Sequence, residues 1–376
     1  MEASEWTPAG AVSAPALVEL AVRQPGPFAT VYLSTEGAID NAAQLTGHRW
    51  RPLRDELAEQ GAPEAPLAAI DDHVRDAHTR GDCLAVVANS SGVLHVEHVR
   101  GVQPLDVARW APLPSLLPIV RWRQDHPAFV AVLADRTGAD LLGVRLEGSD
   151  IEREVEGAEG PVTKVAPGGW SQRRFQQRAE NTWEHNAHLV AEEVAKLAGR
   201  IEARAIVVAG DVRAVSLLED FLPEHLRGLM HQVSGGRMPD GSDERLPGEI
   251  EDAVTEVAAR QTEALIERFH MERGQDDRAA EGADAVLDAL RQARVEVLLI
   301  ADDNVEDRTA WFGPQPVHVA LEPGDLRSLG VDRSDLREAR LADVLVRATL
   351  GTGAGIRVIP AGAGPKDEIG AILRWS

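Results

Sequence analysis

The segment PGGWSQRRFQQR, residues 167–178, combines a glycine pair, a side-chain amide and a group of arginines. Gly168 and Gly169 lack a Cβ atom, so they allow positive φ angles and keep the backbone slim. The amide of Gln172 has one acceptor and two donors, so it could hydrogen-bond a terminal ribose or a water molecule. Guanidinium groups bind phosphates. The segment therefore predicts a slim tip that enters an RNA-lined channel, with these candidate residues: Gly168, Gly169, Trp170, Ser171, Gln172, Arg173, Arg174 and Arg178.

A plainer interpretation of the same segment is a glycine-rich loop that leads into a solvated helix. Two of its residues bear on the choice. Gln172 carries the amide that could make the hydrogen bond. Trp170 has no obvious core to join, so it could stack on a base or fold back onto its own domain. The residues alone leave both interpretations open.

Carboxylates form a second candidate site. Asp135 and Asp211 each follow an apolar run, and Glu184, Glu192 or Glu193 lies on the intervening helix. Carboxylates at strand ends can hold two divalent metals for phosphodiester cleavage, which would make the protein a metal-dependent ribonuclease. The structural alternative is that Asp135 belongs to a turn and Asp211 caps a helix.

Two weaker patterns are best explained structurally. The glycine run GTGAG, residues 351–355, follows a predicted helix and precedes a strand, the reverse of a dinucleotide-binding loop, so it predicts a helix end and a turn. His185 and His188 stand three apart, as zinc ligands can, but no cysteine or third histidine is near them in the sequence. We therefore predict neither a metal nor a cofactor.

A long helix must carry the tip. Its apolar residues recur at intervals of three and four, which is the helical period. They are Phe175, Ala179, Trp183, Ala187, Val190, Val194, Leu197 and Ile201. Two apolar runs around 136–138 predict a hairpin before this helix, and the acidic stretch 151–160 predicts a loop. After the helix, 205–211 reads as a buried strand.

The elements group into three α/β segments. Residues 1–126 form an N-terminal α/β domain, which ends in a proline-punctuated linker at 112–118. Residues 127–270 form a middle domain with the candidate tip, and residues 271–376 form an α/β sandwich in which helices alternate with short strands.

Composition limits the function classes. The chain has 376 residues, too many for one ordinary core, and 39 basic against 61 acidic side chains give a net charge of −22. So acidic a protein is not a general nucleic-acid binder, and any RNA contact needs a local basic patch. The single cysteine, Cys83, excludes an intrachain disulfide and suits the cytoplasm. The acidic start is unlike a signal peptide, and no apolar run reaches the length of a membrane helix.

The three segments and the tip together resemble the archaeo-eukaryotic peptide-chain release factor and Pelota superfamily. The resemblance is greatest to its bacterial branch, which includes the ribosome-hibernation factor Balon and a mycobacterial dormancy-associated homologue. It covers nearly the whole chain. The motifs that carry it are YLST (32–35), LADRTGADLL (133–142), GGWSQRR (168–174), VEVLLI (295–300) and ADVLVRATLGTGAGIRVI (342–359).

The resemblance implies a ribonuclease-H-like middle domain and a C-terminal domain similar to the kink-turn-binding ribosomal proteins. It also implies a protein that occupies the ribosomal A site, with its tip at the peptidyl-transferase centre. It permits elongation factor Tu as a delivery partner, and we expect the protein to be a monomer. In hydrolytic members the glutamine of an uninterrupted Gly-Gly-Gln helps to place the attacking water, so the resemblance makes Gln172 the candidate catalytic residue. Here, however, Trp170 and Ser171 separate Gly169 from Gln172. Catalysis tolerates a displaced group worse than binding does, so we favour occupancy over hydrolysis.

The leading hypothesis from the sequence is therefore a ribosome-binding stress or dormancy factor that is not an enzyme. Within the family, the alternative is a peptidyl-tRNA hydrolase or ribosome-rescue factor that uses Gln172. From another class, the alternative is the metal-dependent ribonuclease that uses Asp135 and Asp211.

Overall fold

A computed structural model describes most of the chain. The described residues are 11–12, 14–35, 42–75, 77, 83–99, 106–146, 150–157, 170–235, 245–274, 278–301 and 308–376; of residues 170–181, the backbone is described. The chain divides into two compact units. Unit 1 is Met1–Gln124 together with Gln261–Ser376, and unit 2 is Asp125–Arg260.

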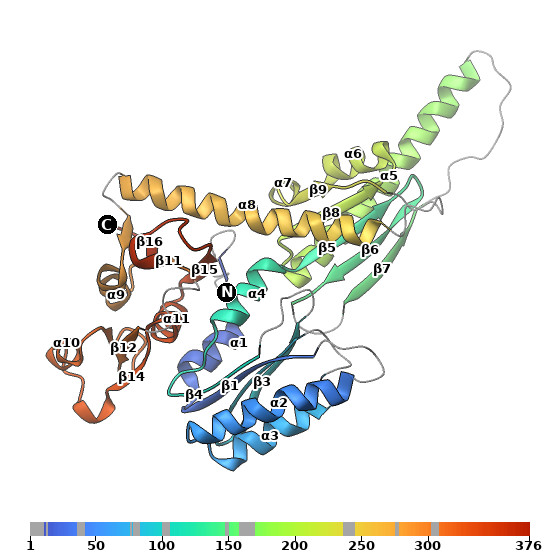
Figure 1. Cartoon of the computed structure of the whole chain (residues 1–376). Coiled ribbons are helices and arrows are strands. Elements are labelled where there is room, and N and C mark those ends of the chain that lie inside the picture. The colour runs from blue at the N-terminus through green and yellow to red at the C-terminus, as the bar shows by residue number, and fades with distance from the viewer. Residues whose placement is uncertain are drawn as a thin grey trace. The chain divides into compact units, whose positions relative to one another are not determined.

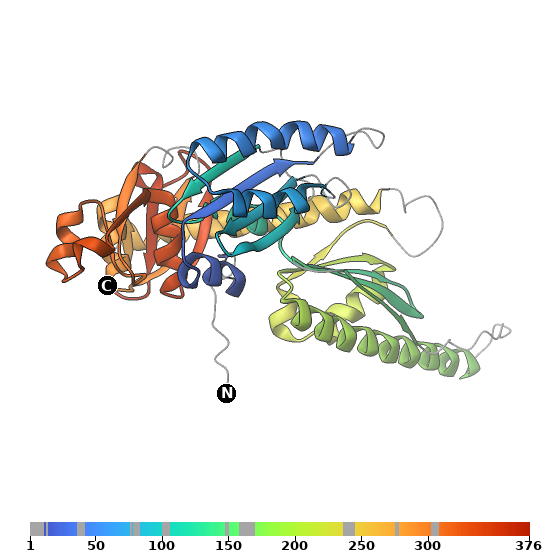
Figure 2. The same ribbon diagram turned by 90° about the horizontal axis from the view of Figure 1, so that it is seen from below.

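The N-terminal part of unit 1 is a four-stranded antiparallel sheet in the order β3-β2-β1-β4, with two helices along one face (Figures 1 and 2). Its elements are β1 (Phe28–Ser34), α2 (Ala42–Glu59), α3 (Glu64–Arg75), β2 (Cys83–Asn89), β3 (Gly92–Val99) and β4 (Val107–Ala111). Alternate residues of a strand face opposite sides. Accordingly, Val31 and Leu33 pack with Leu57 and Ile70 of the helices, whereas Tyr32 faces a second core.

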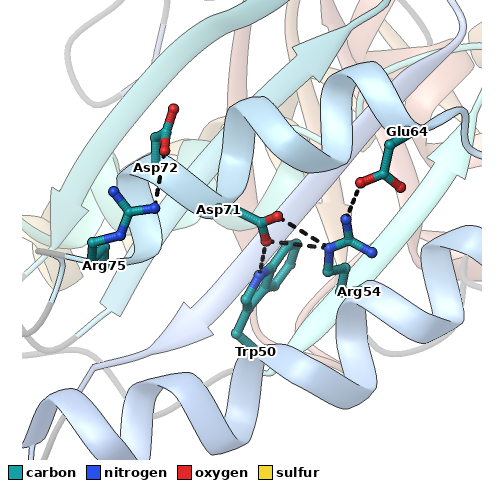
Figure 3. Close-up of polar contacts among 6 residues, drawn as sticks. All are labelled: Trp50, Arg54, Glu64, Asp71, Asp72 and Arg75. Carbon is teal, nitrogen blue, oxygen red and sulfur yellow. Dashed lines mark hydrogen bonds and ion pairs between the residues drawn. The ribbon is translucent and has the colours of Figure 1, made fainter.

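A polar cluster ties α2 to α3 (Figure 3). The indole N–H of Trp50 donates to an Asp71 oxygen at 2.6 Å, and the Arg54 Nε donates to both Asp71 oxygens at 3.3 Å. Arg54 also pairs with Glu64 at the start of α3. Because Trp50 is buried, its N–H needs this partner, and the contact fixes the register of the two helices.

The C-terminal part of unit 1 has a sheet in the order β10-β16-β11-β15 and a smaller sheet in the order β13-β12-β14. Its strands are β10 (Ala279–Glu281), β11 (Val295–Ala301), β12 (Thr309–Phe312), β13 (Val319–Ala320), β14 (Arg337–Arg340), β15 (Gly355–Ile359) and β16 (Ile369–Leu373). Its helices are α9 (Ala283–Arg291), α10 (Pro323–Ser328) and α11 (Leu341–Gly351). The predicted turn at 351–355 is confirmed, since α11 ends at Gly351 and β15 begins at Gly355.

The two parts of unit 1 share one hydrophobic core. Leu17, Leu20, Leu116 and Val120 belong to the same cluster of buried side chains as Val344. The connecting elements are α1 (Pro15–Val18), one π-helical turn (Glu19–Arg23) and α4 (Leu117–Asp125). The leucines of the predicted linker at 112–118 are buried in this core, so the segment connects the two parts through the core.

Unit 2 is a five-stranded mixed sheet in the order β7-β6-β5-β8-β9. Its elements are β5 (Phe129–Ala134), β6 (Gly138–Val144), β7 (Ile151–Glu156), α5 (Trp170–Ile201), β8 (Ala205–Gly210), α6 (Val212–Phe221), α7 (Glu224–Arg227) and β9 (Met230–Gln232). β5, β6 and β7 are antiparallel, whereas β8 runs parallel to β5 and to β9. Helix α8 (Leu246–Gly274) contributes residues to both units.

The predicted loop at 151–160 is wrong for its first part, which is strand β7. The strand lies at the edge of the sheet, where charged side chains can face water while Ile151 and Val155 pack against the sheet's core. Acidic residues thus mark an edge strand here rather than a loop.

The predicted α/β class is confirmed, with helices and mixed sheets throughout. The division into three domains stays a prediction, because the first and third segments lie in one compact unit. Among the described residues, no helix is both long and apolar enough to cross a membrane.

Candidate functional site

The candidate tip lies at the start of helix α5. Gly168 and Gly169 lie outside the described residues. The helix begins at Trp170, so the backbone of Gln172 belongs to its first turn. The remaining candidates, Ser171, Arg173, Arg174 and Arg178, also lie on α5, and their side chains lie outside the described part of the chain. Their assignment to RNA binding stays a prediction.

The later part of α5 packs on the sheet of unit 2. The predicted apolar stripe is confirmed from Ala187 onward, because its members are buried: Ala187, Val190, Val194, Leu197 and Ile201. Figure 1 shows the first part of α5, in light green, extending past the strands of its own sheet. The tip residues therefore stand on a projecting helix that the sheet holds by its far end.

The turn between β5 and β6 lies beside α5. The Asp135 carboxylate accepts hydrogen bonds from the Thr137 backbone N–H at 2.7 Å, the Thr137 hydroxyl at 2.6 Å and the Gly138 N–H at 2.9 Å. These bonds hold the turn closed in the way that an aspartate before a Thr-Gly pair commonly does. The structural role that the sequence suggests for Asp135 is thus present.

Asp211 caps helix α6. Its carboxylate accepts from the backbone N–H of Arg213 at 3.0 Å and of Ala214 at 3.3 Å. It also forms an ion pair with Arg136 at 3.1 Å. Burial by itself would raise the pKa of the Asp211 carboxyl, but the Arg136 guanidinium and the two N–H groups outweigh it and lower that pKa.

A glycine brings Asp211 next to the Asp135 turn. Gly210 has a φ of +141°, and a Cβ atom there would lie 1.8 Å from the carbonyl oxygen of Ala134. Only glycine lets β8 pass so close to β5 at this point. The ends of the two parallel strands thus bring the two aspartates into one neighbourhood, as expected.

Trp183 contacts two arginines. The guanidinium carbon of Arg136 lies 4.7 Å from its ring centre, and that of Arg213 lies 5.1 Å away. Both distances are in the range of cation–π attraction. The prediction that Trp183 belongs to the buried stripe is wrong: the side chain is half-buried, at the point where α5 leaves the core.

Asn186 joins α5 to the same turn. It is buried, and its side-chain amide donates to the carbonyl oxygen of Arg136 at 3.0 Å. The N–H of Gly157, just after β7, donates to the carbonyl oxygen of Thr137 at 2.7 Å. A Cβ atom on Gly157 would lie 2.2 Å from the Asn186 amide, so a larger residue at position 157 would clash with the Asn186 side chain.

We call Arg136, Trp183, Asn186 and Asp211 the base cluster. A small hollow lies against it, and its lining includes Ala134, Trp183, Val190, Arg213 and Leu218. The sequence predicts Arg136 only as part of a turn and does not indicate a role for Asn186. The one signal for Asn186 is its polar side chain between Trp183 and Ala187, two apolar residues at the helical period.

The candidate metal ligands of the ribonuclease alternative do not form a group in the described part of the chain. Within them, no three His, Cys, Asp or Glu side chains are close enough to hold an ion. His188 is half exposed and lies 3.5 Å from Glu192, and its ring meets Phe221 edge-on. Glu193 pairs with Lys196. The Asp211 carboxylate is paired with the Arg136 guanidinium at 3.1 Å.

Comparison with known proteins gives three kinds of match. Residues 128–275 match the model of the Bacterial archaeo-eukaryotic release factor family 2. Uncharacterized protein Rv2629 of Mycobacterium tuberculosis is 28% identical over 364 residues, covering 93% of this chain and 94% of that protein. The Pelota homologue of Natronomonas pharaonis is 26% identical over 189 residues, covering 45% of this chain and 53% of that protein.

A model of ribosome-bound archaeal Pelota and ABCE1 is similar in structure. The alignment covers 100% of this chain and 99% of that chain, with 14% sequence identity and a TM-score of 0.35. The family match spans β5 to α8 and so contains the whole of α5 and the base cluster.

Proposed function

The chain is a Pelota-like protein of the bacterial archaeo-eukaryotic release factors, and we propose that it is a translation factor that binds the ribosomal A site. The observation that carries the proposal is the projecting start of α5, which bears Gln172 and the arginines within the family match. A helix that leaves its domain can reach a site that the bulk of an acidic protein cannot approach.

In this proposal the tip enters the peptidyl-transferase centre. Arg173, Arg174 and Arg178 meet rRNA phosphates, which supply most of the affinity. The glycine pair, Gly168 and Gly169, keeps the tip slim. The protein acts as a monomer in the cytoplasm and keeps idle ribosomes intact under stress.

The net charge of −22 opposes this binding at long range. Salt screens that repulsion over about 8 Å at physiological ionic strength, so the arginines at the tip decide the contact. A protein that delivers the factor, such as elongation factor Tu, would overcome the slow encounter.

Occupancy of the cleft is favoured over hydrolysis. Gln172 lies in the first turn of a helix, two positions after Trp170, rather than directly after the glycine pair. Helical backbone fixes where its amide can reach, and water activation tolerates a displacement of about 1 Å poorly. The Gln172 amide then serves as a hydrogen-bonding group.

The test is sedimentation through sucrose with purified ribosomes. We expect the wild-type protein to co-sediment with vacant ribosomes, and Arg173→Glu with Arg174→Glu to abolish this. The matched control is Arg153→Glu with Arg200→Glu, which adds the same four negative units of charge at exposed sites of unit 2. Equal loss in both pairs would mean that net charge, rather than the tip, governs binding, and would overturn the proposal.

A further inference from the structure

We propose that the base cluster is a positioning device that sets the direction in which the start of α5 leaves unit 2. The inference rests on the proposed function in one respect: the direction matters because the tip must enter a narrow site. The contacts that set the direction of the helix lie within the protein and can be tested without the ribosome.

Two contacts with Arg136 hold α5 at one point, and a third contact fixes Arg136 itself. The Asn186 amide donates to the carbonyl oxygen of Arg136, and the Arg136 guanidinium lies on the Trp183 ring. The same guanidinium pairs with Asp211, which is itself fixed as the cap of α6. Arg136 therefore connects α5 to the ends of both parallel strands through its backbone and its side chain.

The contacts lie at the boundary between the packed and the projecting part of α5. From Ala187 onward the stripe is buried in the core of unit 2. Immediately before Asn186, Glu184 and His185 are exposed. Trp183, which is half-buried, lies at this boundary, and its ring contacts the guanidinium groups of Arg136 and Arg213. The base cluster thus acts where a helix can bend or tilt.

The return chain is anchored to the same turn. Gly157 follows β7, donates to the carbonyl oxygen of Thr137 and packs against the Asn186 amide. The segment that holds the glycine pair therefore begins at Gly157 and ends in α5 with both anchors on the turn Asp135–Gly138. A change in the turn moves both anchors together.

The helix amplifies small changes at its base. A helix rises 1.5 Å per residue, so the backbone of Gln172 stands about 21 Å along the axis from Asn186. A tilt of about 10° at the base moves that point by roughly 4 Å, which exceeds the roughly 1 Å that catalytic or snug contacts tolerate. Arg136, Trp183 and Asn186 can thus control the tip without touching it.

The test is a distance measurement by pulsed electron paramagnetic resonance on the full chain. Spin labels are placed at Gln177→Cys on α5 and at Glu219→Cys, an exposed site on α6, in a Cys83→Ser background. We expect one narrow distance distribution. Residue 177 lies about 14 Å along the axis from Asn186, so a tilt of about 10° moves it by roughly 2 Å. Asn186→Ala and Arg136→Ala should each shift or broaden the distribution by about 2 Å or more.

Two further variants separate positioning from general stability. Val194→Ala removes buried volume from the packed part of α5, so it should lower the melting temperature and leave the distance distribution unchanged. Arg136→Lys keeps the charge that pairs with Asp211 but loses the planar group on Trp183, so it should shift the distribution partway even if Arg136→Ala fails to fold.

An unchanged distribution in Asn186→Ala and in the folded Arg136 variants would overturn the inference. The proposed function fails separately, if the wild-type protein does not sediment with ribosomes, because the distance measurement needs no ribosome.

Discussion

Gln124 and Val358 are joined by two hydrogen bonds, although 234 positions separate them in the sequence. The Gln124 amide donates to the carbonyl oxygen of Val358 at 2.8 Å and accepts from its N–H at 2.8 Å. β15 is the edge strand of its sheet, so the amide occupies backbone groups that a further strand would otherwise pair. Ile356, two positions earlier on β15, exchanges two hydrogen bonds with the backbone of Val12.

We therefore expect Gln124→Ala to destabilise unit 1. Two buried hydrogen bonds are lost and two buried backbone groups lose their partners, so the free energy of unfolding should fall by about 2 to 4 kcal/mol. Urea unfolding measures this. Gln60→Ala is the control, since the Gln60 amide makes the same kind of contact with β4 at an exposed site and should cost less than about 1 kcal/mol. If the two substitutions lowered the free energy of unfolding equally, the burial of these hydrogen bonds would not determine their contribution to stability.

Acid should weaken the base cluster through Asp211. The pKa of this carboxyl is lowered in the folded protein, so its stabilising contribution is complete above its unfolded pKa of about 4 and is lost as the pH falls through the lower folded value. Compared with Asp211→Asn, the wild-type protein should be more stable at pH 7, and the difference should shrink below about pH 4.

Thermal unfolding of the two proteins across this pH range measures the difference. Arg136→Ala should also move the Asp211 pKa up toward its ordinary value, which carboxyl-selective NMR can follow. An Asp211 pKa that does not respond to Arg136→Ala would contradict the assignment of the ion pair.

Gln172→Ala distinguishes occupancy from hydrolysis. If the amide only hydrogen-bonds in the cleft, its loss costs about 0.5 to 1.5 kcal/mol, and ribosome affinity falls about tenfold or less. If it positions water, binding is kept and the rate of peptide release falls about a hundredfold or more. We expect little release by the wild-type protein in an assay with stalled peptidyl-tRNA complexes. Rapid release that Gln172→Ala abolishes at equal occupancy would establish the rescue-factor alternative.

The ribonuclease alternative predicts RNA cleavage that depends on Mg²⁺ or Mn²⁺. We expect none, because the Asp135 carboxylate holds a turn and Asp211 is bonded to Arg136 and to the start of α6. The assay is incubation of labelled RNA with either metal and with a chelator as control. Metal-dependent cleavage by the wild-type protein that disappears in Asp211→Asn would reverse this ordering.

Much of the architecture could be predicted because the signals are local. The buried positions of a helix recur every three to four residues, so the apolar stripe from Ala187 to Ile201 can be recognised in the sequence. The turn at Asp135 and the cap at Asp211 can also be recognised in the sequence, because each carboxylate accepts hydrogen bonds from backbone N–H groups within three residues.

The edge strand β7 was not predicted, because charged residues are typical both of loops and of strands with one face in water. Trp183 fits the helical period, yet its place at the end of the packed face leaves it between arginines rather than in the core.

Only the tertiary structure decided the base cluster and the Gln124–Val358 contact. Each joins residues whose separation along the chain carries no periodic signal: Asn186 with Arg136, and Gln124 with Val358. Such pairs form when packed elements bring unpaired donors and acceptors together away from water, where an unmade hydrogen bond costs most. The sequence by itself determined the α/β class, the helix that bears the candidate tip and the local capping aspartates. The fold decided where that helix is held.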